Sequence, residues 1–276
     1  MRYGLKGLLS VCAVGGALLA ATGVAKAGYV VFNGGDPGDG VPSGADGLDF
    51  SGNFPLALHL AYDASSPAPI VGSAHFENAY PTNHPADFSP PSGWVAPAGT
   101  SATGPNVYFN GAVTYNFGSS PLDDGVETVM NTVWAGTLNV NVSVGADGSG
   151  ARLITNHLYP MQIIGLADHD PGASTRIVGL DIENINQGEY DFNAPQGYNG
   201  SPQEGAAIVQ DFVAGDTTGD GAMTFRIYQP DGLPAGNNAG WMSAVTFEDL
   251  TAVPEPGSLM LAGGIAAGAF LRRRRR

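Results

Sequence analysis

Nine Asn-Gly and Asp-Gly pairs are spread along the chain, and they limit what it can fold into more than any other feature. Asn and Asp tolerate a positive φ, and Gly adopts one without steric cost, so each pair favours a tight turn between antiparallel strands. The pairs are Asn33-Gly34, Asp39-Gly40, Asp46-Gly47, Asn110-Gly111, Asp124-Gly125, Asp147-Gly148, Asn199-Gly200, Asp220-Gly221 and Asp231-Gly232. Turns at this density predict an all-β fold.

Short segments between the turns alternate apolar and polar residues, as half-buried strands do. The clearest is 137–144, where Leu138, Val140, Val142 and Val144 are predicted to face a core. The other predicted strands are 29–32, 57–62, 70–76, 112–117, 153–158, 177–182, 207–213, 224–228 and 242–250. No amphipathic helix is predicted in this region. Many short strands indicate an antiparallel β-sandwich or jelly roll, in one or two subdomains.

Residues 78–105 interrupt this pattern because they contain six prolines. Proline cannot donate a backbone hydrogen bond and is excluded from central strands. We predict a long surface loop here, at a boundary between two sheets or subdomains.

The N-terminus has the three parts of a signal peptide. Arg2 and Lys6 form a basic start, residues 7–24 are almost all apolar or small, and Ala25-Lys26-Ala27 has the small-x-small pattern that signal peptidase cleaves. Residues 1–27 are therefore predicted to direct export through the Sec machinery and to be removed. The single cysteine, Cys12, lies within this segment, so the exported chain is expected to have no disulfide bond.

The region between the ends is strongly acidic. Residues 28–253 contain 24 of the 25 acidic residues but only three of the eleven basic ones, an excess of 21 negative charges. Such a surface repels nucleic acid and attracts divalent cations. Nucleic-acid binding is excluded on this basis.

The C-terminus, residues 253–276, also has three parts. Pro254-Glu255-Pro256 is followed by a short apolar run at 258–271, predicted as a short transmembrane helix, and then by five arginines, Arg272, Arg273, Arg274, Arg275 and Arg276. The prolines keep the motif extended, and the arginines hold the end of the run on the cytoplasmic side of a membrane. Fourteen residues span about 21 Å as a helix, which is short for a hydrocarbon layer of about 30 Å.

This three-part tail resembles the sorting signal of PEP-CTERM proteins, a family that also carries an N-terminal signal peptide. The resemblance implies processing by a membrane-embedded exosortase in a Gram-negative bacterium. It further implies a transient stay in the inner membrane, followed by delivery to the cell surface and its exopolysaccharide matrix. Residues 28–252 are then the working body of the exported protein.

Motifs for nucleophilic, zinc, nucleotide or dinucleotide chemistry do not occur between the two ends, so we expect no enzyme. Five histidines are scattered along the chain, and a lone histidine in a strand is more often packed than a ligand. The densest group, Asp168-His169-Asp170, precedes Pro171-Gly172 and is more simply a polar turn. The acidic residues Asp36, Asp39, Asp46 and Asp49 share a glycine-rich loop that would suit a cation or water.

Calcium is the one cofactor for which the sequence offers a candidate loop. Asp216, Thr218 and Asp220 supply oxygens at alternate positions before Gly221, as calcium loops do. The twelfth position is Ile227, where an EF-hand needs an acid. An Asp-Gly turn before the next strand is the simpler alternative.

The sequence is compatible with three functions. The first is a structural or adhesive component of the extracellular matrix, associated with exopolysaccharide. The second is a carbohydrate-binding module that uses aromatic stacking platforms, with Trp94, Trp134, Trp241 and Tyr198 as candidates. The third is a secreted hydrolase, which a β fold by itself does not exclude.

Overall fold

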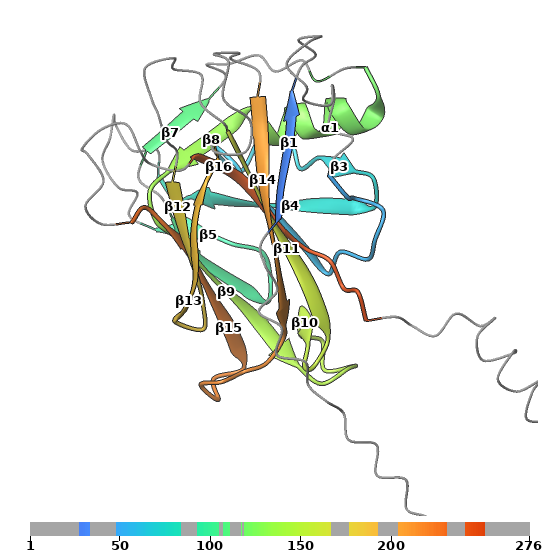
Figure 1. Cartoon of the computed structure of the whole chain (residues 1–276), viewed down its shortest axis with the longest axis vertical. Helices are drawn as coiled ribbons and strands as arrows, with labels where there is room; N and C mark the ends of the chain where they lie inside the picture. The colour runs from blue at the N-terminus through green and yellow to red at the C-terminus, as the bar shows by residue number, and fades with distance from the viewer. Residues whose placement is uncertain are drawn as a thin grey trace, which may run out of the picture.

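The protein is described here by a computed structural model (Figure 1). It describes residues 28–33, 48–83, 93–104, 107–110, 117, 119–166, 177–192, 204–230 and 241–251. These residues form two β-sheets and one short helix, which confirms the predicted all-β fold.

The larger sheet has ten strands, with the order β1-β14-β11-β16-β2-β4-β3 along its main path. Strand β5 pairs with β4, and β8 pairs with both β16 and β7. The bounds are β1 Gly28–Asn33, β2 Leu56–Leu60, β3 Ile70–Val71, β4 Ala74–Pro81, β5 Trp94–Val95, β7 Val107–Asn110, β8 Thr132–Ala135, β11 Leu158–Leu166, β14 Glu204–Val213 and β16 Trp241–Phe247.

The smaller sheet has six strands in the order β10-β9-β15-β12-β13, with β6 paired to β9. Its members are β6 Thr100–Thr103, β9 Leu138–Gly145, β10 Leu153–Ile154, β12 Ile177–Ile182, β13 Ile185–Asp191 and β15 Ala222–Tyr228. The described pairs are antiparallel except for two parallel pairs, β2 with β4 and β10 with β9.

The main core lies between the two sheets, which makes the body a β-sandwich. Strand β9 shows how the sequence specifies it. The side chains of Leu138, Val140, Val142 and Val144 are buried, and those between them are not, as the alternation predicts. Inward residues of the larger sheet pack against them, among them Leu58, Ile163, Ile208 and Phe247.

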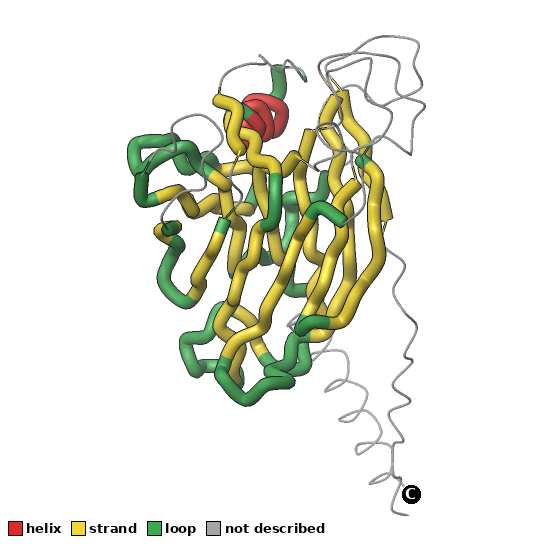
Figure 2. Tube along the Cα trace, turned by 90° about the vertical axis from the view of Figure 1, so that its left-hand side faces the viewer, coloured by secondary structure: helices red, strands yellow, loops and turns green. Residues whose placement is uncertain are grey.

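A helix, α1 (Pro121–Met130), packs on the outer face of the larger sheet over a second core. The helix is green in Figure 1 and red in Figure 2, which places it at one end of the strands. Small residues of the sheet, including Ala57, Ala207 and Ala244, allow this close packing.

The absence of a helix was a wrong prediction, and so was the turn at Asp124-Gly125, which lies within α1. Ser120 forms a capping box with Asp123, and Pro121 begins the helix. Gly125 is needed for packing rather than for a turn, because a Cβ there would lie 2.9 Å from Val71 Cγ2.

The predicted proline-rich loop at 78–105 is also corrected. Strand β4 continues to Pro81, and β5 and β6 follow within the segment. Pro81 is the last residue of its strand, where its missing N–H costs least. Of the predicted strand 112–117, only Phe117 lies among the described residues, and it is not in a strand.

Two predicted strands are each divided by a residue with positive φ. Gly72 (φ 57°) separates β3 from β4, and Asn156 (φ 68°) separates β10 from β11.

Candidate functional site

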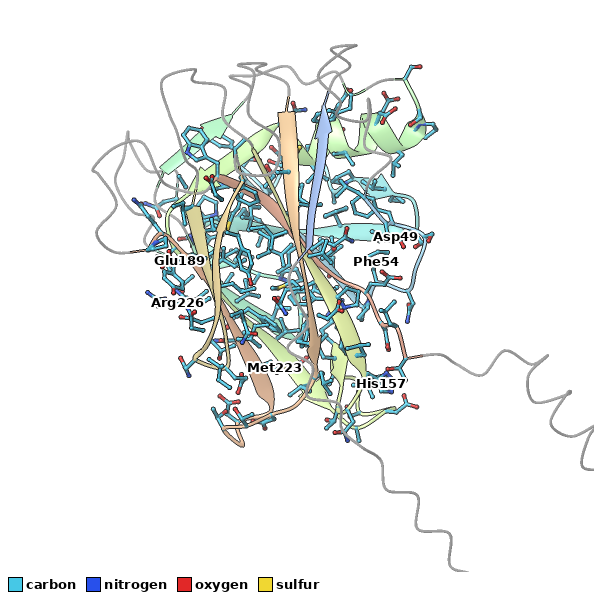
Figure 3. The ribbon with its side chains drawn as sticks, in the orientation of Figure 1. Asp49, Phe54, His157, Glu189, Met223 and Arg226 are labelled. Carbon is cyan, nitrogen blue, oxygen red and sulfur yellow. The ribbon has the colours of Figure 1, made fainter. Side chains whose placement is uncertain are left out.

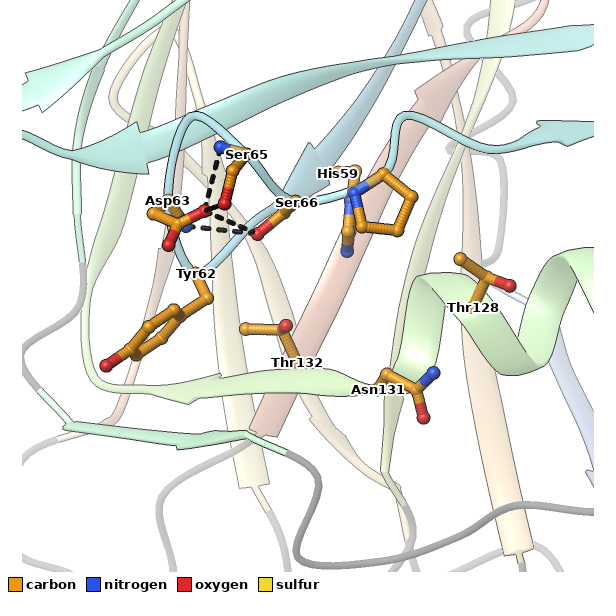
Figure 4. A pocket seen from close by; sticks show the side chains of 9 residues that line it. His59, Tyr62, Asp63, Ser65, Ser66, Thr128, Asn131 and Thr132 are labelled. Carbon is orange, nitrogen blue, oxygen red and sulfur yellow. Dashed lines mark hydrogen bonds between the residues drawn. The ribbon is translucent and has the colours of Figure 1, made fainter.

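A pocket of about 460 Å³ opens where the loop after β2 meets the C-terminal end of α1 (Figure 4). Nine residues line it, and only Pro67 among them lacks a polar side chain. The volume falls within the range of about 300–1,000 Å³ that is typical of small-molecule sites.

His59 lies on β2, in register with Asn78 on the parallel strand β4. The Nδ2 atom of Asn78 donates to the carbonyl oxygen of Ser66 at 2.7 Å, and its Oδ1 lies 3.1 Å from Nδ1 of His59. An amide oxygen can only accept a hydrogen bond, so Nδ1 of His59 carries the proton. The other ring nitrogen, Nε2, therefore keeps its lone pair when the ring is neutral.

The His59 side chain is almost fully buried, with 1% of the residue exposed. Burial lowers the pKa of His59, and the opposing effects of Asn78 and the carbonyl groups of Pro67 and Val129 are smaller. The ring is therefore neutral at pH 7. Among the described residues Nε2 has no hydrogen-bond partner, although a buried polar atom left in this state costs about 1–3 kcal/mol.

Asp63 organises the loop that forms one wall of the pocket. Its Oδ1 accepts hydrogen bonds from the backbone N–H of Ser65 at 2.8 Å and from the Ser65 hydroxyl at 2.7 Å. Ser66 Oγ donates to the same oxygen at 3.3 Å. These hydrogen bonds, led by that of the Ser65 hydroxyl, lower the pKa of Asp63, so the wall carries a negative charge at neutral pH.

The end of α1 forms another wall. The helix ends at Met130 with Asn131 as its C-cap, and β8 begins at the next residue, Thr132. Unpaired carbonyl groups give a helix C-terminus a partial negative charge, and the last turn of α1 contains no basic residue. Together with Asp63, this end makes the pocket electronegative.

No pattern in the sequence indicates this pocket. His59 stands between Leu58 and Leu60 and looks like an ordinary strand residue, while its partner Asn78 is 19 residues away. The Asp63-to-Pro67 segment has the composition of a turn, which marks a loop but not a binding site.

The loop proposed for calcium lies between β14 and β15, at the opposite end of the sheets from α1 (Figure 1). The carboxylate of Asp216 accepts hydrogen bonds from the backbone N–H groups of Thr218, Gly219 and Gly221. These lower the pKa of Asp216, with Gly221 the largest contributor. Asp220 accepts a hydrogen bond from the backbone N–H of Ala222 at 3.0 Å.

This geometry is that of a hydrogen-bonded turn, and calcium binding by the loop stays a prediction. Within the described part of the chain, no three His, Cys, Asp or Glu side chains lie close enough together to hold a metal ion. Asp49 is engaged locally with Ser51, whereas Asp36, Asp39 and Asp46 lie outside the described residues.

The tryptophans proposed as stacking platforms are core residues instead. Trp134 is fully buried and Trp241 is 9% exposed, while the partly buried Trp94 packs on Trp134 with ring centroids 4.9 Å apart. The strand pattern brings the rings of Trp134 and Trp241 inward, so these two present no exposed face to a sugar, whereas Trp94 stays partly exposed. Tyr198 lies outside the described residues.

The remaining histidines do not gather into a site among the described residues. His75 is exposed on β4, and Nδ1 of His157 lies within hydrogen-bond distance of Asp249 Oδ2, at 2.8 Å. Figure 3 labels His157 near the start of β11. His84 and the Asp168-His169-Asp170 group lie outside the described residues.

The chain leaves the body through a short, well-fixed segment after β16. The backbone N–H groups of Glu248 and Leu250 donate to the carbonyl oxygens of Pro160 and Leu158. The Leu158 N–H in turn donates to Thr251 Oγ1 at 3.1 Å. The body is thus held firmly up to Thr251, the last described residue.

The targeting residues themselves fall outside the described residues. These are Ala25 and Ala27 of the signal peptide, Pro254, Glu255 and Pro256 of the sorting motif, and Arg272 to Arg276 of the tail. None of the described segments is a helix with the length and apolarity that a membrane crossing needs.

Comparison with protein families identifies the segment that follows Thr251. The profile of the PEP-CTERM protein-sorting motif matches residues 252–276. The chain carries a PEP-CTERM sorting motif. It is therefore an exported protein of the kind that an exosortase sorts to the cell surface, as the resemblance implied.

Comparison with solved structures finds plant ectodomains. The extracellular domains of ANXUR2 and ANX1 from Arabidopsis thaliana are 12% and 8% identical to the chain, each with a TM-score of 0.46. Each match covers 72% of this chain and 49% of the other, so this chain aligns with about half of each ectodomain.

A family 35 carbohydrate-binding module from Clostridium thermocellum is 13% identical, with a TM-score of 0.30 over 43% of this chain and 78% of the module. No curated protein matches the chain in sequence.

Proposed function

We propose that the body is a non-enzymatic structural or adhesive component of the cell-surface matrix, associated with exopolysaccharide. The observation that carries this proposal is the PEP-CTERM motif, which begins directly after the last fixed residue of the sandwich. Exosortase is the processing partner, and the membrane is a transient location during export.

The negative charge of the body and its lack of catalytic motifs support this role. Its excess of 21 negative charges over residues 28–253 keeps it soluble and draws divalent cations, which can join it to anionic polymers. The sequence between the targeting segments lacks the motifs of nucleophilic or zinc catalysis. A carbohydrate-binding module is the alternative, and the polar pocket beside His59 is the feature that favours it.

The test uses residues 28–253, because both sheets and both cores lie within them. We expect the purified body to co-sediment with polysaccharide from the matrix of the producing cells. We expect no turnover in a panel of glycoside, ester and peptide substrates. Turnover would identify a hydrolase, and failure to co-sediment would contradict the matrix role.

A further inference from the structure

The starting observation is the buried acceptor on His59. The hydrogen bond from Asn78 Nδ2 to Ser66 fixes the amide orientation, so Nδ1 of His59 donates to Asn78 Oδ1 and Nε2 points its lone pair elsewhere. No described residue donates to Nε2. His59 is among the residues that line the pocket, and we expect a donor bound there to supply the missing hydrogen bond.

The electrostatics of the pocket select the kind of donor. An ionised Asp63 and the C-terminal end of α1 both disfavour an anionic ligand. A metal ion is not favoured either, since no cluster of three ligating side chains occurs in the described part of the chain. A ligand that donates hydrogen bonds and carries no negative charge therefore fits the pocket.

The other lining groups suit the same ligand. Asn131 offers an amide and Thr132 a hydroxyl, each able both to donate and to accept. Tyr62 contributes a half-buried ring, and an aromatic ring can pack on the C–H face of a sugar. Hydroxyl groups and apolar C–H faces occur together in saccharides.

We propose that this pocket binds a neutral sugar unit and that one sugar hydroxyl donates a hydrogen bond to His59 Nε2. The inference rests on the proposed function and deepens it, because it names the class of ligand and the place where the polysaccharide is held. The sugar hydroxyl satisfies the buried nitrogen, while Asn131 and Thr132 bind neighbouring hydroxyls.

The test follows the His59 ring nitrogens by nuclear magnetic resonance in ¹⁵N-histidine-labelled residues 28–253. The probes are the methyl glycosides of glucose, galactose and mannose, and a mild hydrolysate of the matrix polysaccharide. We expect the ¹⁵N chemical shift of Nε2 to change in a saturable way with at least one probe, while Nδ1 keeps its proton. This measurement needs no substitution at a buried position.

Variants of the lining residues test whether the sugar binds in this pocket. We expect Asn131→Ala and Thr132→Val each to weaken sugar binding at least tenfold. Asn53→Ala is the matched control, since Asn53 is exposed and is not among the lining residues. Circular dichroism and melting curves check that each variant is folded.

The outcomes separate the two proposals. If the body binds whole polysaccharide but no probe changes Nε2, or if Nε2 contacts only water, the pocket proposal is wrong and the matrix role stands. Unchanged sugar affinity in both pocket variants would also overturn it. If the wild-type body binds neither polysaccharide nor sugar, both proposals fail.

Discussion

Arg152 joins the two sheets of the sandwich through Glu77, with Nη1 of Arg152 lying 2.6 Å from Oε1 of Glu77. Arg152 stands just before β10 of the smaller sheet, and Glu77 is on β4 of the larger one. The guanidinium also donates to the backbone oxygens of Ala98 and Pro55. One side chain thus ties together three separate segments.

Replacing Arg152 should therefore destabilise the body. We expect Arg152→Met to lower the free energy of unfolding by about 2 kcal/mol, because it leaves Glu77 and two carbonyl groups without their donor. Arg226→Met is the control, since Arg226 pairs with Asp181 within one sheet and is half exposed. It should cost no more than about 1 kcal/mol. If urea unfolding showed that the two variants lose the same free energy of unfolding, the bridging role of Arg152 would be contradicted.

Two neighbouring tryptophans should respond differently to replacement by phenylalanine. Nε1 of Trp134 donates to the carbonyl oxygen of Leu60 at 2.9 Å, whereas Nε1 of Trp94 is buried without a described partner. Trp134→Phe orphans a buried acceptor and should cost about 1–3 kcal/mol beyond the loss of ring area. Trp94→Phe removes an unsatisfied donor and should cost clearly less. The reverse order in denaturant unfolding would show this assignment to be wrong.

Glu248 should make stability depend on pH. Burial, with a smaller effect from the charge of Asp49, raises the pKa of Glu248 above its ordinary value of 4.5. Its contribution is therefore present below pH 4.5 and is lost as the pH rises through the folded-state pKa. We expect Glu248→Gln to melt higher than wild type at pH 7.

At pH 4 that difference should become small, because wild-type Glu248 is then mostly protonated in both states. Glu189→Gln, at an exposed position, is the control for the change in net charge. If Glu248→Gln raised the melting temperature equally at pH 4 and pH 7, titration of the Glu248 carboxyl would be excluded as the cause.

Millimolar calcium should raise the melting temperature of residues 28–253, because cations that bind the acidic native body stabilise it by mass action. We expect the increase to persist in Asp220→Asn, since the loop it belongs to is held by its own hydrogen bonds. An equal increase in sodium chloride of matched ionic strength would identify screening instead.

The sorting motif should control processing. Replacing Pro254, Glu255 and Pro256 by alanine keeps the apolar run but removes the extended signature, so the full-length protein should stay in the inner-membrane fraction. Wild-type protein at the surface should lack the arginine tail. Mass spectrometry that recovers surface peptides ending in Arg276 would refute processing.

The sequence alone determined the class of fold and the route of the protein. Turn pairs and the alternation in 137–144 are local signals, so they correctly predicted short strands and the inward residues of β9. The tail is likewise a contiguous signal, which is why the motif at 252–276 could be recognised without a structure. Both depend only on residues close together in the chain.

Tertiary structure decided what distant segments do together. Asp124-Gly125 marks a turn by composition, but it lies within α1, where Gly125 packs so closely on Val71 that a Cβ would lie 2.9 Å from Val71 Cγ2. Trp134 could face out or in by its strand pattern, and the contact with Leu60, 74 residues away, holds it in the core. The pocket exists because β4 sets Asn78 beside His59 while the C-cap of α1, Asn131, lies at its wall. No local pattern encodes such pairings, since they arise only when the sheet brings these strands together.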